Sequence, residues 1–316
     1  MQQNGLGQVI QRLLSQYKSY ALSSKPKSLF KLQTRPHQMT GKPLNTVNPL
    51  QTIFKRLSST MSQIIQKPAS EDYRAIVHGF LPNNAKLLSP QNLGNSGEMH
   101  FADLDGDTEK ELIASYALND EVRTIILKKQ NERWSKVAEI NNTGYDSVHY
   151  SGVADLMGNG RKQILLGLVS KGKASALHGY TFENNMINKM FDHNYHRFEV
   201  VATPANQNSI SKTHLAVWNR KDPDTYNIDM YHWNGQQLEP LTNVALYYYK
   251  KVVPFYAQKV KRSPKLPSNW YNFADALVKA DAKRDALQAI ELGMRQDTNF
   301  TLKENFLELK NRILGK

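Results

Sequence analysis

The chain has 316 residues, and 41 Lys and Arg against 28 Asp and Glu give it a formal net charge of +13. A hydrophobic content of 40% is enough for a core, which excludes wholesale disorder, and the absence of Cys excludes disulfides, thiolate metal sites and cysteine nucleophiles. The sequence predicts no membrane-spanning helix and shows no secretory pattern at its start. The length predicts two domains, or one large domain with appendages.

Residues 1–70 are predicted to form a basic arm. This segment contains no Asp or Glu, and its basic residues are Arg12, Lys18, Lys25, Lys27, Lys31, Arg35, Lys42, Lys55, Arg56 and Lys67. Apolar residues recur with helical spacing over 6–17 and 50–65. Three interpretations stay open: an amphipathic arm for an anionic membrane or nucleic acid, an organelle-targeting segment, or a poorly ordered leader with one helix docked on the body.

The middle of the chain contains an internal repeat. The tripeptide Ala-Asp-Leu at 102–104 recurs 52 residues later at 154–156, and the apolar run at 112–114 recurs at 164–166. A weaker third copy spans 205–217. A period near 50 with several strands per unit is typical of propeller-like radial repeats, in which each unit stacks on its neighbours.

Each unit is predicted to be a short β-meander. The expected strands include 111–116, 124–129, 134–140, 226–233 and 237–241. Turns are expected at Asn131-Glu132 and at Asn234-Gly235, and Asn-Gly between apolar runs is a strong hairpin signal. The sequence therefore predicts a mainly β fold over 71–241, made of three propeller-blade-like units.

The first unit contains an acidic turn, Asp103-Leu104-Asp105-Gly106-Asp107-Thr108-Glu109-Lys110-Glu111. Carboxylates at alternate positions around a glycine point several hard oxygen atoms at one centre, which suits Ca²⁺ better than a transition metal. The turn is not an EF-hand loop, because Thr108 and Ala114 stand where that loop has Gly and Glu. The alternative is a solvated acidic loop that holds no ion.

This acidic turn, followed by a short apolar strand, resembles the FG-GAP/VCBS repeat of integrin-α-like β-propellers. The resemblance covers roughly 87–241 and implies a loop between two blade strands that binds Ca²⁺. The side-chain ligands and the carbonyl ligand that it implies are Asp103, Asp105, Asp107 and Glu111, with the carbonyl of Glu109. It also implies a cell-surface or envelope context.

The matching loops of the other two units depart from the family pattern. Their four ligand positions are Asp155, Met157, Asn159 and Gln163 in the second unit, and Asn206, Asn208, Ile210 and His214 in the third. A thioether cannot replace a carboxylate as a ligand of Ca²⁺. Only the first loop is therefore predicted to bind a metal ion.

Residues 242–316 are predicted to be helical. A kinked helix or two short helices are expected over 243–262, with the break at Pro254. The helices expected after it are 269–280, 282–295 and 302–314.

The stretch 272–300 resembles a single tetratricopeptide (TPR) repeat, with Ala274 and Ala286 where that family has small residues, although any helical hairpin looks similar. A second basic cluster lies in this part of the chain, at Lys250, Lys251, Lys259, Lys261, Arg262 and Lys265. It is either a solvated helix face or a contact for an anionic partner.

No phosphate-binding loop, nucleophile elbow or zinc motif is found. The close pair His193 and His196, beside Asp192, is expected in an extended hairpin insertion of the second unit, and it would hold a transition metal only with further ligands. We therefore expect a non-enzymatic, Ca²⁺-stabilised binding or scaffold protein with a protein or anionic polymer partner. The alternative is an intracellular protein whose basic arm binds nucleic acid or an anionic membrane, and the cellular location stays open.

Overall fold

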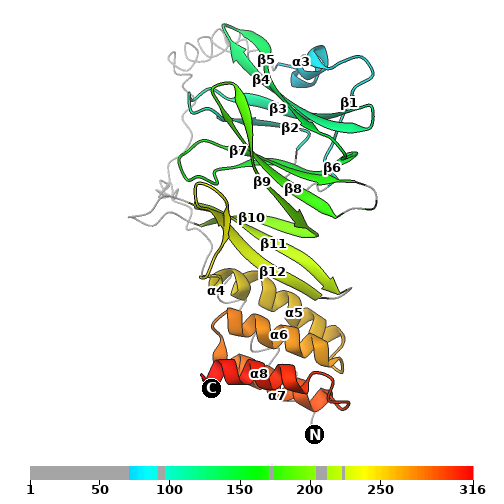
Figure 1. Cartoon of the computed structure of the whole chain (residues 1–316), viewed down its shortest axis with the longest axis vertical. Coiled ribbons are helices and arrows are strands. Elements are labelled where there is room, and N and C mark those ends of the chain that lie inside the picture. The colour runs from blue at the N-terminus through cyan, green and yellow to red at the C-terminus, as the bar shows by residue number, and fades with distance from the viewer. Residues whose placement is uncertain are drawn as a thin grey trace, which may run out of the picture.

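The computed structural model describes residues 71–91, 97–170, 172, 174–203, 212–222 and 225–315. In these residues three antiparallel β-sheets are stacked in a row, and helices lie at both ends of the row (Figure 1). The predicted mainly β fold with a helical C-terminus is therefore confirmed. The basic arm, residues 1–70, lies outside the described residues, so all three interpretations of it stay predictions.

The first sheet contains β1 (Lys86–Leu87), β2 (Met99–Ala102), β3 (Glu111–Leu118), β4 (Glu121–Gln130) and β5 (Arg133–Asn142). Both β1 and β2 pair with β3, and β4 and β5 follow in chain order. Two tight turns join β3 to β4 and β4 to β5, and each has two residues with positive φ, at Asn119-Asp120 and at Asn131-Glu132. This backbone geometry matches the twist of a hairpin, and it places a turn at the predicted Asn131-Glu132.

The second and third sheets are four-stranded meanders in chain order. Their strands are β6 (Ser147–Ala154), β7 (Gln163–Val169), β8 (Ser175–Glu183) and β9 (Met186–Tyr195), then β10 (Arg197–Thr203), β11 (Lys212–Asp222), β12 (Thr225–Trp233) and β13 (Leu238–Pro240). Residues that recur 52 positions apart occupy equivalent places. Ala102 is the last residue of β2, which pairs with β3, and Ala154 is the last residue of β6, which pairs with β7. The expected hairpin insertion is wrong, because β9 is the regular fourth strand of the second sheet.

The strands β3, β7 and β11 are apolar on both faces because another sheet or a helix covers each face. In β7, Leu166 packs with the first sheet, in a cluster that includes Ile113 and Ile126. The next residue back, Leu165, points the other way and packs with Leu215 of the third sheet. Both leucines are fully buried, so the alternation of side chains along one strand joins three sheets.

A short helix, α3 (Tyr73–Phe80), covers the outer face of the first sheet. Its one buried apolar residue, Val77, packs in a cluster with Leu112 and Ile125. Just before the helix, the Glu71 carboxylate lies 2.6 Å from the Lys129 amine. The same carboxylate accepts a hydrogen bond from the Trp134 indole, which fixes the helix to the end of the stack.

The C-terminal helices cover the other end of the stack. They are α4 (Ala245–Tyr247), the π-helical segment η1 (Tyr248–Val252), α5 (Val253–Arg262), α6 (Pro267–Lys279), α7 (Lys283–Gln296) and α8 (Lys303–Leu314). They share one core with the third sheet, which includes Trp218, Met230 and Trp270. None of the described helices has the length and apolarity that crossing a membrane requires.

Pro254 widens the first of these helices and does not break it. Proline has no N–H to donate to the carbonyl four residues earlier, and its ring crowds that carbonyl. The helix forms a π-turn here, in which the Val253 N–H donates to the Tyr248 carbonyl five residues back. The chain therefore follows one helical path through α4, η1 and α5, in place of the break predicted at Pro254.

Candidate functional site

The acidic loop, residues 103–111, joins β2 to β3 and is shaped by its own carboxylates. Asp103 accepts hydrogen bonds from the backbone N–H groups of Gly106 and Thr108. Gly106 and Thr108 both have positive φ, at 87° and 76°, so the loop doubles back tightly. In the same way Asp107 accepts from the N–H of Glu109 at 2.9 Å. These bonds hold a loop that presents its remaining carboxylate oxygens toward β4.

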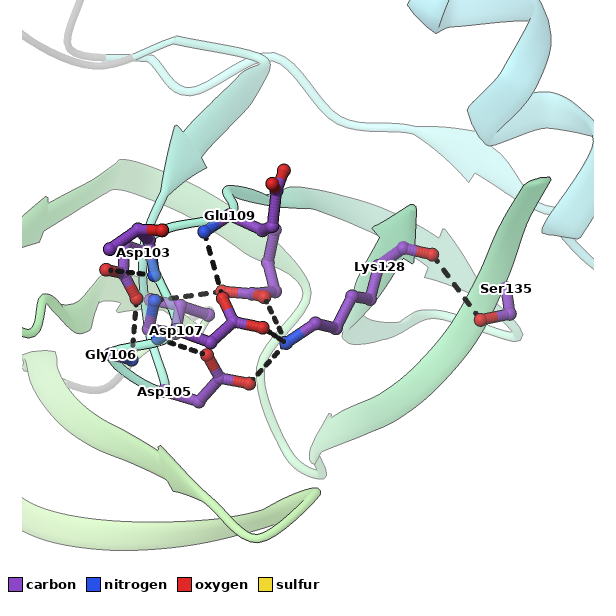
Figure 2. Close-up of polar contacts among 10 residues, drawn as sticks. Asp103, Asp105, Gly106, Asp107, Glu109, Lys128 and Ser135 are labelled. Carbon is purple, nitrogen blue, oxygen red and sulfur yellow. Dashed lines mark hydrogen bonds and ion pairs between the residues drawn. The ribbon is translucent and has the colours of Figure 1, made fainter. Parts of the chain in front are cut away.

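The centre of the acidic loop is occupied by the amine of Lys128, which reaches it from β4 (Figure 2). Lys128 Nζ lies 2.5 Å from Asp105 Oδ2, 2.6 Å from Asp107 Oδ2 and 3.2 Å from Glu111 Oε1. The Lys128 side chain is 7% exposed and that of Glu111 is fully buried. One ammonium group therefore contacts three carboxylates, of which Glu111 is buried and Asp107, at 45% exposed, faces solvent.

The pKa directions agree with a lysine that is charged in this site. Burial works to lower the pKa of the Lys128 amine, but its contacts with Asp105, Asp107 and Glu111 outweigh burial and leave that pKa above its ordinary value. The contact with Lys128 lowers the pKa of Asp107. Burial raises the pKa of Glu111, and this rise is opposed by the hydrogen bond from the Leu104 N–H and by Lys128.

Lys128 already contacts three of the carboxylates that the predicted Ca²⁺ site would need. Single oxygen atoms of Asp103, Asp105 and Glu111 lie within 4.8 Å of one another, which is close enough for shared ligation. Lys128, however, contacts one oxygen each of Asp105, Asp107 and Glu111, and a second cation at this centre would meet its charge. Glu109 contributes its backbone N–H, and its carboxylate extends away from Lys128 (Figure 2). With Lys128 in place the residues do not fit Ca²⁺, and the calcium site stays a prediction that this geometry argues against.

The second loop, residues 155–163, has the same shape with fewer charges. Asp155 accepts from the N–H groups of Gly158, Asn159 and Gly160, as Asp103 accepts in the acidic loop. Gln163 Oε1 accepts from the Leu156 N–H at 2.7 Å. This bond is the counterpart of the 2.9 Å bond from the Leu104 N–H to the Glu111 carboxylate. The two loops also touch, because the Lys162 N–H donates to the Asp103 carbonyl.

The remaining predicted positions are not brought together in the described structure. Of the third loop, Asn206, Asn208 and Ile210 lie outside the described residues, and His214 lies in β11. In the predicted histidine pair, the His193 ring packs against Tyr231. His196 Nδ1 accepts from the Arg220 N–H.

Asp192 instead contacts His178, which no sequence motif singles out. His178 Nε2 lies 3.1 Å from Asp192 Oδ2, and the two residues face each other in the pairing of β8 with β9. His178 Nδ1 is 3.0 Å from the Tyr180 hydroxyl, which donates to Asn142 at the end of the first sheet. In the sequence, His178 and Tyr180 are two polar residues two positions apart in a largely apolar strand, and only the strand register shows that Asp192 lies opposite His178.

A hollow of about 600 Å³ lies between the third sheet and the start of the helical segment. Its lining residues are Glu199, Val200, Val201, Ala202, His214, Met230, Leu241, Asn243, Leu246, Tyr247, Lys250 and Lys251. The wall is mainly apolar, and Lys251 at its rim lies 3.4 Å from Glu199. The Trp218 indole N–H donates to the Tyr247 hydroxyl at 2.7 Å and so fixes one side of the wall. The π-turn η1 supplies both rim lysines.

No protein-family model matches this chain, and a comparison with curated proteins finds no match.

Proposed function

We propose that this chain is a non-enzymatic binding or scaffold protein, and that the hollow beside the third sheet is its binding site. The observation that carries the proposal is a mainly apolar concavity whose volume falls in the range of about 300–1,000 Å³ usual for ligand sites. Among its ionised lining groups, two lysines outnumber Glu199. A partner with an apolar part and an acidic group fits this lining, which agrees with the expected protein or anionic partner.

The three sheets support the FG-GAP/VCBS resemblance as part of the same proposal. Each sheet contains a four-stranded meander, and the acidic loop and the second loop repeat one backbone shape between equivalent strands. We take the sheets as three blade-like units in an open row, with the TPR-like hairpin of α6 and α7 belonging to the helical layer at its end. In this arrangement the repeats serve as a framework, and the hollow forms where the framework meets the helices.

Binding of anilinonaphthalene sulfonate, an anionic apolar fluorophore, tests the site. We expect the full chain to bind one equivalent of the probe, and Leu246→Glu to weaken binding at least about tenfold, because a carboxylate at the rim repels the sulfonate and wets the wall. Leu314→Glu is the matched control, since Leu314 in α8 is 48% exposed and Leu246 is 52% exposed. Equal probe binding by the two variants would overturn the assignment.

The basic arm supports a second candidate function, binding to nucleic acid or an anionic membrane. Residues 1–70 carry ten Lys and Arg and no acidic residue, and Lys261, Arg262 and Lys265 add exposed charge at the end of α5. Salt separates the two candidates on the full chain. Binding of the arm to phosphatidylserine vesicles falls steeply with added salt, whereas binding of the probe, which carries a single charge and is held mainly by the apolar wall, falls much less.

A further inference from the structure

Lys128 and the three carboxylates that it contacts occur together in the first sheet, and all four are replaced by uncharged residues at the equivalent places of the second sheet. Leu112 of β3 pairs with Leu127 of β4, and the next residues outward are Glu111 and Lys128. In the second sheet Ile164 pairs with Tyr180, and the next residues outward are Gln163 and Thr181. Where the first sheet has a lysine and a buried carboxylate, the second sheet therefore has the uncharged residues Thr181 and Gln163.

The other two carboxylates change in the same way. Met157 and Asn159 of the second loop stand where the acidic loop has Asp105 and Asp107, although Asp103 has its counterpart in Asp155. The loop shape survives these changes, because Asp155 and Gln163 make the same backbone bonds. The negative charges of Asp105 and Asp107 are thus not needed for the fold of such a loop, because Asn159 accepts from the Arg161 N–H as Asp107 accepts from the Glu109 N–H. In the acidic loop these two charges face the ammonium group.

Charge alone explains why these groups belong together. Glu111 is fully buried, and Asp105 is 20% exposed, so without a cation their negative charges would repel each other in a site with little water. The Lys128 amine donates a hydrogen bond to Asp105 Oδ2 and lies within ion-pair distance of Asp107 Oδ2 and Glu111 Oε1, so it balances their charge without any metal, although within the described part of the chain Glu111 Oε1 accepts no hydrogen bond. The four-carbon stem of Lys128 reaches from β4 and places the charge at the centre of the loop (Figure 2).

We propose that Lys128 is the built-in cation of the acidic loop, in place of Ca²⁺. The loop therefore keeps its shape without any metal ion, and removal of the amine converts it into a divalent-cation site. This inference is independent of the hollow and of what binds there, since the acidic loop joins two strands of the first sheet and the hollow is lined by the third sheet and the helical segment.

Thermal melting of the full chain in Ca²⁺ and in chelator tests the proposal, together with calorimetric titration of Ca²⁺. The wild-type protein should melt at the same temperature in both conditions and give no binding heat. Lys128→Met keeps the length of the side chain and removes its charge, so this variant should melt lower in chelator and recover in Ca²⁺. A rise of about 5 °C or more is expected at a hundredfold excess over Kd.

A control variant copies the second loop into the first. Asp105→Met, Asp107→Asn, Glu111→Gln and Lys128→Thr together should give a stable protein that does not respond to Ca²⁺. Two results would overturn the proposal. One is Ca²⁺ binding by the wild-type chain that Asp105→Ala abolishes, and this result needs no lysine variant to fold. The other is a folded Lys128→Met variant without Ca²⁺ binding.

Discussion

At the scale of single residues, His178 shows how a titratable group is accommodated between packed sheets. It is 3% exposed, and Tyr145 and Asn142 reach it from the end of the first sheet. Asp192 and Lys189 reach it from β9. Burial lowers the pKa of His178, and the nearby Lys189 adds to this, while Asp192 acts in the opposite direction. The imidazole is therefore held in its neutral form, as a hydrogen-bonding link between two sheets.

This lowered pKa makes stability depend on pH. Between the lowered pKa and the ordinary value near 6.5, the unfolded chain binds a proton at His178 that the folded chain does not. The contribution of His178 is therefore fully present above pH 6.5 and is lost as the pH falls through that range. We expect the slope of unfolding free energy against pH, between pH 5 and 7, to fall by up to about 1.4 kcal/mol per pH unit in His178→Gln. Urea unfolding at several pH values measures it.

Tyr180→Phe is the control for the histidine. It removes the hydroxyl that links His178 to Asn142, and so costs stability of about 1–3 kcal/mol, but it removes no group that titrates near neutral pH. Its stability should be lower than that of the wild-type protein by the same amount at every pH tested. Burial also lowers the pKa of His100, His149 and His193, so part of the slope remains in both variants. An unchanged slope in His178→Gln would show that the imidazole does not stay neutral in the fold.

At the scale of elements, the C-terminal helices pack closely because small residues lie at their contacts. Ala274 of α6 and Ala286 of α7 are fully buried. Gly293 of α7 lies so close to its neighbours that a Cβ atom would be 2.5 Å from Phe306 and 2.7 Å from Trp270. The missing side chain at this position is what lets α8 and α6 both approach α7.

Replacement of Gly293 reverses the usual rule for a glycine inside a helix. Gly→Ala in a helix normally stabilises by about 0.5–1 kcal/mol, because it reduces the freedom of the unfolded chain. Gly293→Ala should instead destabilise by about 1–3 kcal/mol, since the added methyl group overlaps two rings or their stems. Gly79→Ala in α3 is the matched control, because nothing lies within 4 Å of the new atom there, and it should not destabilise. Denaturant unfolding monitored by circular dichroism measures the stability of both variants. A gain of stability in Gly293→Ala would contradict the close packing at this position.

At the scale of the whole molecule, the repeat is the part of the fold that the amino-acid pattern predicts best. The 52-residue shift is visible because each unit buries an apolar strand on both faces, so Leu112 and Ile164 fall at equivalent places. The role of Lys128 could not be predicted in this way. It lies 17 residues beyond Glu111 on the next strand, and only the register of β3 with β4 brings the two charges together. The same is true of His178 and Asp192, which meet across β8 and β9.

Within the described residues, the buried clusters join the first sheet to the second and the second to the third, so the row of sheets is nearly one-dimensional. In such an array, stability is roughly a sum of terms for each unit and for each interface, and unfolding can begin at the weaker end. The β7 strand lies at the middle of the row and contributes to both interfaces of the second sheet. Two adjacent leucines on it offer the same chemical change at two different interfaces.

We therefore expect Leu166→Ala and Leu165→Ala to differ in where they loosen the molecule and not in how much. Both side chains are fully buried, so each variant should lose about 2–5 kcal/mol. Leu166→Ala opens the interface with the first sheet, and hydrogen exchange should rise mainly in α3 and β2–β5. Leu165→Ala opens the interface with the third sheet, and exchange should rise mainly in β10–β13 and the helices that share their core. Identical exchange patterns in the two variants would mean that the stack unfolds as one unit, because coupling through β7 would then exceed the stability of either half.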